Sequence, residues 1–136
     1  MRVALVLPLA LLACTGLDRV DQGTLQPQQV TGPCQVKKFF IMDFTSARTY
    51  LSVAHNGVGC TFTIFNPDLQ IVTTAALVTA LPSHGHAEAG LLLAGRQAVI
   101  SYTPQPGYMG SDSFGVTLEP NARGVIFTVG VQPPGR

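Results

Sequence analysis

The chain has 136 residues, of which 46% are apolar and 11% charged, and its formal net charge is +1. This length allows one domain plus a leader or tail, and the near-zero charge gives no electrostatic reason to expect a nucleic acid or an acidic polymer as partner. The 14 glycines and 10 prolines are spread along the chain, which is typical of many short strands joined by tight turns.

Residues 1–13 have the pattern of an export signal. Arg2 is followed by an apolar run over 3–13, which is too short to span a membrane as a helix of about 20 residues but fits the core of a secretory signal peptide. The run ends in Leu-Leu-Ala-Cys14 and resembles the bacterial lipoprotein signal. That resemblance implies lipidation of Cys14; the alternatives are an ordinary signal cleaved nearby or an unprocessed apolar start.

Residues 14–31 are predicted to form a polar tether. The segment is rich in Gln and carries Gly23 and Pro27 without apolar periodicity, although part of it could order against the domain instead. The residue after the cysteine is Thr15, not Asp. By resemblance to the lipoprotein sorting rule, this favours the outer membrane if the cell is Gram-negative, and we expect an exported protein of the cell envelope.

The three cysteines are an odd number for an exported protein. Lipidation of Cys14 would leave Cys34 and Cys60 as an even pair in an oxidising compartment. A bridge between them closes a loop of about 27 residues, which the chain-entropy argument values at roughly 3–4 kcal/mol. We predict this disulfide over the alternatives, two free thiols or a metal site, because neither cysteine has a second Cys or His at the spacing of a metal knuckle.

From residue 32 to 133 the pattern predicts one all-β domain. Residues 60–65 alternate, with Cys60, Phe62 and Ile64 on one face. Phe39 and Phe40 are adjacent on a strand and should therefore point to opposite faces. Seven or eight short strands at spacings of about ten residues indicate an antiparallel sandwich. The expected strands are 34–41, 48–54, 60–65, 86–93, 97–103, 112–118 and 124–132, with 69–80 undecided between a strand and a helical turn.

The second half carries a family resemblance. The segments Pro-Ser-His-Gly-His-Ala (82–87) and Val-Ile-Ser-Tyr-Thr-Pro-Gln-Pro-Gly-Tyr-Met-Gly-Ser-Asp-Ser-Phe-Gly-Val (99–116), with the closing strand that ends at Val131, resemble the bacterial Ig-like and cadherin-like repeat family. The resemblance covers about residues 76–131 and implies an Ig-like sandwich. Members usually occur as tandem repeats in long surface proteins, whereas this chain has one copy.

The stretch between residues 102 and 114 is interpreted as a structural corner. Its aromatic residues would fill the core from two strands, its prolines would stiffen the crossing and its glycines would permit positive φ. Its aspartate would accept backbone N–H bonds across the turn, the alternative being a calcium ligand. The corner residues are Tyr102, Pro104, Gly107, Gly110, Asp112 and Phe114.

One segment could carry chemistry. On an extended strand His84, His86 and Glu88 would share one face, as a transition-metal set requires. A turn at Gly85 would instead point His84 away from His86, and we favour that interpretation, with no metal. The sequence contains no nucleophile elbow, local carboxylate pair or phosphate-binding glycine loop, so we expect no enzyme, no cofactor and no small-molecule substrate.

These patterns together predict an exported, lipid-anchored, non-catalytic Ig-like protein. We expect it to act as an adaptor or accessory subunit of a bacterial envelope or surface assembly, through binding to another protein. The membrane would be contacted through the lipid anchor, and no nucleic acid is expected. The alternative is a surface module that binds a carbohydrate or another ligand, which the absence of Trp and the presence of only three Tyr make poorer.

Overall fold

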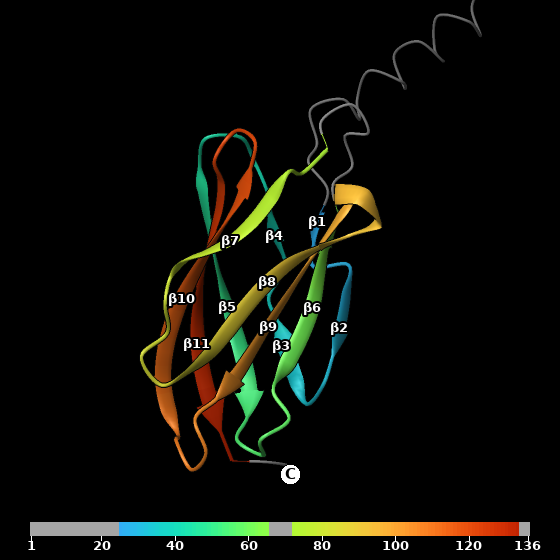
Figure 1. Ribbon diagram of the computed structural model, residues 1–136. Helices are drawn as coiled ribbons and strands as arrows, with labels where there is room; N and C mark the ends of the chain where they lie inside the picture. Colours follow the sequence, from blue (N-terminus) through green and yellow to red (C-terminus); the bar gives the residue numbers. More distant parts are fainter. Residues whose placement is uncertain (1–24, 66–71, 134–136) are drawn as a thin grey trace, which may run out of the picture.

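The computed structural model describes residues 25–65 and 72–133. The predicted signal (1–13), Cys14 and the first part of the predicted tether lie outside the described residues. Within these residues the chain is almost entirely β-structure (Figure 1). The strands are β1 (Leu25–Gln26), β2 (Gln29–Thr31), β3 (Cys34–Val36), β4 (Phe39–Phe40), β5 (Ser46–Ala54), β6 (Cys60–Phe65), β7 (Ala75–Ala80), β8 (Gly85–Leu92), β9 (Gln97–Pro104), β10 (Gly110–Glu119) and β11 (Arg123–Gln132).

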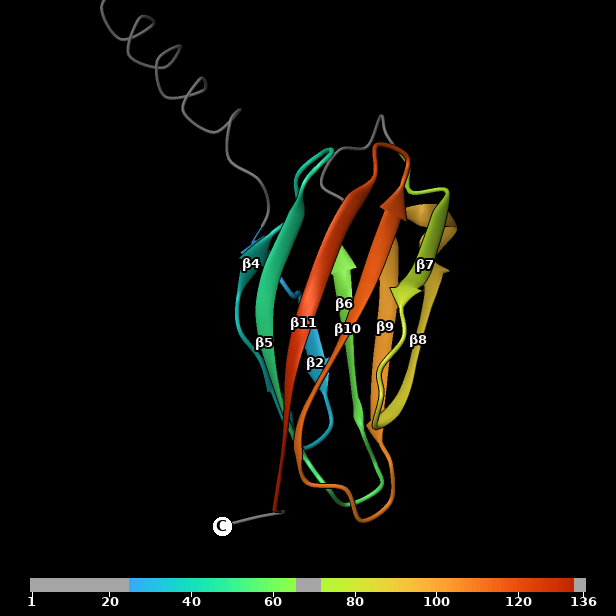
Figure 2. The same cartoon turned by 90° about the vertical axis from the view of Figure 1, so that its left-hand side faces the viewer.

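The strands form three sheets, two of them large. The first has the order β3-β5-β11-β10-β7, the second β2-β6-β9-β8, and β1 pairs only with β4 (Figures 1 and 2). All pairs are antiparallel except β5 with β11, which run parallel over nine residue pairs from Ser46–Gly124 to Ala54–Gln132. Parallel neighbours need a long crossover connection, and here the crossover contains most of the domain. The expectation of purely antiparallel sheets is wrong at this pair.

The core lies where side chains of all three sheets meet around Phe127 of β11. Its ring packs against Phe114 of β10 at 4.8 Å, Phe62 of β6 at 5.3 Å and Phe39 of β4 at 5.9 Å between ring centroids. Offset and edge-on aromatic packing at these separations adds to the burial of apolar area. The five- and four-stranded sheets are therefore held by one continuous apolar core, which also contains Leu51, Ile64, Ile100, Val116, Leu118, Val125 and Val129.

Alternation in the sequence located most strands. The predicted strand 60–65 is confirmed at its bounds, and the strands predicted at 97–103, 112–118 and 124–132 are each extended by one to three residues in β9, β10 and β11. Phe39 is 5% exposed and Phe40 46% exposed, so the two do face opposite ways. The single strand expected at 34–41 is instead divided into β3 and β4, because β3 pairs with β5 whereas β4 pairs with β1.

The end of the predicted tether is part of the domain. Residues 25–31 contain β1 and β2, which pair with β4 and β6. The cause is the side chain of Gln26, which is fully buried, donates to the carbonyl of Phe65 at 2.7 Å and accepts from the N–H of Phe65 at 3.1 Å. A buried amide is stable only with such partners, so Gln26 fixes this segment against the end of β6.

The predicted disulfide is confirmed. Cys34 of β3 is bonded to Cys60 of β6, with their Cα atoms 5.7 Å apart, and the bond joins the five-stranded sheet to the four-stranded sheet. Because structural disulfides persist in oxidising compartments, the bond indicates an extracytoplasmic location. Among the described residues, none forms a helix with the length and apolar character needed to cross a membrane.

Candidate functional site

The corner between β9 and β10 is organised by the carboxylate of Asp112. It accepts hydrogen bonds from the backbone N–H groups of Ser83 and His84, both at 2.9 Å, and from the hydroxyl of Tyr102 at 2.8 Å. The N–H of the next residue, Ser113, also donates to it at 2.9 Å. Asp112 therefore ties the β7–β8 connection to both β9 and β10. Sequence reasoning foresaw backbone donors across the turn but not the Tyr102 hydroxyl.

The electrostatics of this corner favour a charged Asp112 and a neutral Tyr102. Burial alone would raise the pKa of Asp112, but the hydrogen bonds from Ser83, Tyr102, Ser113 and His84 outweigh burial and hold this pKa below its usual value. Burial, followed by the hydrogen bond to Asp112 and its negative charge, raises the pKa of Tyr102 well above its usual value. Neither group is poised to exchange a proton near neutral pH, so the corner has the character of a structural brace.

The other predicted corner residues shape the same region. Tyr102 and Phe114 are fully buried, and their rings stack at 5.5 Å between centroids. Pro104 ends β9, and the chain then turns through Gly107 and Gly110, whose φ angles are +81° and +132°. These positive values lie in the region that favours glycine.

The three candidate metal ligands divide into two separate arrangements. The ring of His84 stacks on Tyr108 at 4.1 Å between centroids with an interplanar angle of 3°. His86 and Glu88 contact each other on the outer face of β8, with 2.7 Å between Nε2 and Oε2, and both side chains are largely exposed. No group of three potential metal-ligating side chains occurs among residues 25–65 and 72–133.

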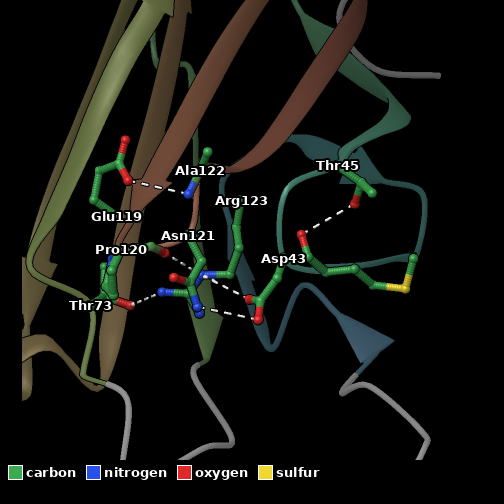
Figure 3. A network of polar contacts seen from close by, with 9 residues as sticks. Asp43, Thr45, Thr73, Glu119, Pro120, Asn121, Ala122 and Arg123 are labelled. Atoms are coloured by element: carbon green, nitrogen blue, oxygen red, sulfur yellow. Dashed lines mark hydrogen bonds and ion pairs between the residues drawn. The ribbon is translucent and has the colours of Figure 1, made fainter.

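A second polar cluster lies at the opposite end of the strands, around the buried Arg123 at the start of β11 (Figure 3). Its Nε donates to the carbonyl of Pro120 at 3.1 Å and lies 3.9 Å from Asp43 Oδ1, while its Nη2 donates to Thr73 Oγ1 at 3.3 Å. Asn121 donates to the other oxygen of Asp43 at 3.2 Å. This cluster joins the β4–β5 loop, the β10–β11 turn and the segment before β7, and no local sequence pattern predicted it.

The outer edge of the five-stranded sheet is formed by β7. Among the described strands it is hydrogen-bonded to β10 alone, and its sequence from Ala75 to Leu81 contains no charged residue and no proline. Leu77 is 51% exposed and Leu81 80% exposed. By contrast, β2 and β3 are only three residues long, and β8 carries the exposed His86–Glu88 pair. Short length and charge are the usual protections of an edge, so by these two criteria β7 is the least protected edge of the two sheets, with β8 of the other sheet running beside it (Figure 2).

No protein-family model and no curated protein matches this chain. Three features of the described residues bear on function: the structural brace at Asp112, the braced loop cluster at Arg123, and the uncharged edge at β7.

Proposed function

We propose that this chain is an exported, lipid-anchored, non-catalytic protein with an Ig-like sandwich, which acts as an adaptor or accessory subunit of a bacterial envelope assembly. Three features of the chain support this function. The Leu-Leu-Ala-Cys14 pattern supports an anchor, the Cys34–Cys60 bond supports an oxidising compartment, and the order of the two large sheets around one core supports the sandwich. The membrane contact is through lipid on Cys14, and the functional contact is with a protein.

The observation that carries the adaptor function is the unprotected edge of β7. An exposed, uncharged edge strand presents unpaired N–H and C=O groups, which are a template for a strand from another chain. Strand addition of this kind supplies affinity through backbone hydrogen bonds and specificity through alternate side chains. On β7 the alternate side chains on the outer face are Leu77 and Thr79, and Thr79 is bonded to Thr117 of β10 at 3.1 Å, which leaves Leu77 as the apolar contact for a partner.

The test is site-specific crosslinking in the organism that carries the gene. A photo-crosslinking amino acid placed at Leu77 should capture one protein in native membranes, and the same amino acid at Val58, which is 67% exposed in the β5–β6 loop, should not. The Leu77→Lys variant should lose that protein on co-purification, while Val58→Lys keeps it. Equal recovery of the partner protein by Leu77→Lys and Val58→Lys would contradict strand addition at β7. If the chain purifies without any partner protein, the adaptor proposal is contradicted.

The second candidate is a ligand-binding surface module. It is favoured by a hollow of about 320 Å³ lined by Ser83, Gly85, His86 and residues 103–106. Thr103 and His86 offer polar groups there, beside the flat faces of two prolines. If the chain purifies without a protein partner, glycan-array binding that is abolished by His86→Ala and kept by Val58→Lys would establish this alternative.

A further inference from the structure

Six of the fourteen exposed large apolar side chains among the described residues lie at the end of the domain where the chain enters it. The end is made by the β4–β5 loop, the β10–β11 turn, the segment before β7 and the 3-10 helix η2 (Leu93–Gly95) after β8. We call this region the apolar end and define it by Leu25, Phe40, Met42, Phe44, Leu92 and Leu93, all of which are at least 41% exposed.

Backbone hydrogen bonds show that these loops form one continuous end. Leu25 is paired with Phe40 across β1 and β4. The N–H of Phe44 donates to Asn121 at 2.7 Å, Thr74 donates to Glu119 at 2.7 Å, and Thr73 donates to Gly95 at 3.1 Å. The contacts run from the β1–β4 pair around to η2, and in Figures 1 and 2 these loops cap the end opposite the β5–β6 and β9–β10 loops.

The loops of the apolar end hold their exposed residues in strained backbone conformations. The non-glycine residues with positive φ in the described part of the chain are Phe44, Leu93, Ala94, Asn121 and Ala122, and all five lie at this end. Bulky residues rarely adopt φ near +55°, and such strain collects at functional surfaces. Phe44 is 73% exposed and Leu93 66% exposed, so the two bulkiest of these residues lie in solvent and do not pack in the core.

The Arg123 cluster explains how the strained loop is held. Asp43, the neighbour of Phe44, is fixed by Asn121 and lies beside the Arg123 guanidinium (Figure 3). Thr45 closes the loop by donating to the carbonyl of Met42 at 3.2 Å. Met42 and Phe44 are therefore exposed to solvent on a loop that these contacts hold in place.

We propose that the apolar end rests on the lipid surface to which the chain is anchored, with Phe44 and Leu93 inserted at the level of the headgroups. The inference rests on the proposed anchor at Cys14 and deepens it. Ten residues lie between Cys14 and Leu25, and the eleven Cα–Cα steps that join these two residues span at most about 36–40 Å. The anchored domain therefore stays close to the membrane with its apolar end nearest.

The charges of the apolar end fit a zwitterionic surface. The ionisable side chains at its described loops are two acids, Asp43 and Glu119, and two bases, Arg96 and Arg123, so these described loops carry no net charge that would attract anionic lipid. Burial of apolar side chains at the headgroup boundary is then the driving force. Docking should accordingly occur on phosphatidylcholine and be insensitive to salt.

The chain contains no tryptophan, so a single introduced indole reports its own environment. We would express the full chain in a bacterial host, purify the processed Phe44→Trp protein, and place it in phosphatidylcholine vesicles with or without brominated acyl chains. Interfacial side chains lie about 5–10 Å into the headgroup boundary, so we expect brominated lipid to reduce its fluorescence by about half. Leu93→Trp should be quenched similarly, and Val58→Trp, at the opposite end, should be unaffected.

Mass spectrometry of Cys14 in the same samples separates the two proposals. One outcome is that Cys14 is acylated but the indoles of Phe44→Trp and Leu93→Trp are quenched no more than that of Val58→Trp. That outcome would contradict docking and would support the lipid anchor. The opposite outcome is that Cys14 is unmodified but the indoles at positions 44 and 93 are quenched when the protein is added to vesicles. That outcome would support docking and contradict the proposed anchor at Cys14. If brominated lipid quenches neither indole in vesicles and both indoles are shielded from aqueous iodide in native membranes, a protein covers the apolar end and docking on lipid is wrong.

Discussion

Removal of the Asp112 carboxylate should be among the most destabilising single changes at a polar residue of this protein. The Asp112→Ala substitution leaves the Tyr102 hydroxyl, which is fully buried, without a partner, at a cost of about 1–3 kcal/mol. The N–H groups of Ser83 and His84 lose a charged acceptor but lie nearer to solvent, and each should contribute about 0.5–1 kcal/mol. We expect the free energy of unfolding to fall by about 3 kcal/mol.

The measurement is urea unfolding at pH 7 with the disulfide intact, followed by circular dichroism. Tyr102→Phe removes only the hydroxyl and should cost about 1 kcal/mol, and it should cost less still in the Asp112→Ala background, where the hydroxyl is already unpaired. The exposed neighbour gives a control, since Ser113→Ala should stay within about 0.5 kcal/mol of the wild type. If Asp112→Ala lowers the free energy of unfolding no more than Ser113→Ala does, Asp112 is not a structural brace.

The same pair sets the pH range of stability. The pKa of folded Asp112 is lowered, so its contribution is present above the unfolded pKa of about 3.9 and is lost as the pH falls through the folded pKa. The pKa of folded Tyr102 is raised, so its contribution is present below about pH 10 and is lost as the pH rises further. The stability difference between wild type and Asp112→Asn should be constant from about pH 5 to 9 and shrink below about pH 4.

Three further changes test other parts of the fold. Replacing both Cys34 and Cys60 by Ser opens a loop with a sequence separation of 26 and should cost about 3.5 kcal/mol in urea unfolding; a loss below about 1 kcal/mol would contradict the inter-sheet staple. Gly85→Ala should lower the melting temperature because its Cβ would lie 2.6 Å from the Tyr102 hydroxyl and 2.7 Å from the Thr103 carbonyl. Gly90→Ala, on the same strand, should lower it far less because its Cβ would lie 3.7 Å from the nearest atom, in Val99 of β9; equal shifts would refute the contact at Gly85. Arg123→Met should lower the free energy of unfolding by about 1–2 kcal/mol because the hydrogen bonds to Pro120 and Thr73 are lost. It should also speed hydrogen exchange in the β4–β5 loop, and unchanged exchange there would show that Arg123 does not brace the loop.

The sequence was most informative where structure depends on neighbouring residues. Strand β6 was predicted at its bounds because Cys60, Phe62 and Ile64 alternate with Thr, and the disulfide followed from the number of cysteines and their compartment. The relation between Phe39 and Phe40 followed from the pleat of a strand alone. In each case the property is set within a few residues of chain or by composition.

Contacts between distant segments were beyond the reach of such patterns. Gln26 is bonded to Phe65, 39 residues away, and Arg123 to Thr73, 50 residues away. Nothing around a glutamine in a polar segment distinguishes a tether from an ordered strand, which is why β1 and β2 were assigned to the tether. The parallel pairing of β5 with β11 also depends on the path of the whole chain between them. The edge position of β7 had a partial signal, the uncharged run from Ala75 to Leu81.

The two proposed surfaces are geometrically compatible, and their combination restricts the partner. Strand β7 begins beside the apolar end, where Ala75 pairs with Glu119, and runs away from it to Ala80 (Figure 2). If the apolar end lies on the membrane, β7 runs away from the lipid surface, and its open edge faces sideways into solvent. A strand added to it would run toward or away from the bilayer, and such a strand can come from a protein that is itself held at the membrane. Anchoring the apolar end would then align the β7 edge for its partner before the two meet, which lowers the entropy lost on association.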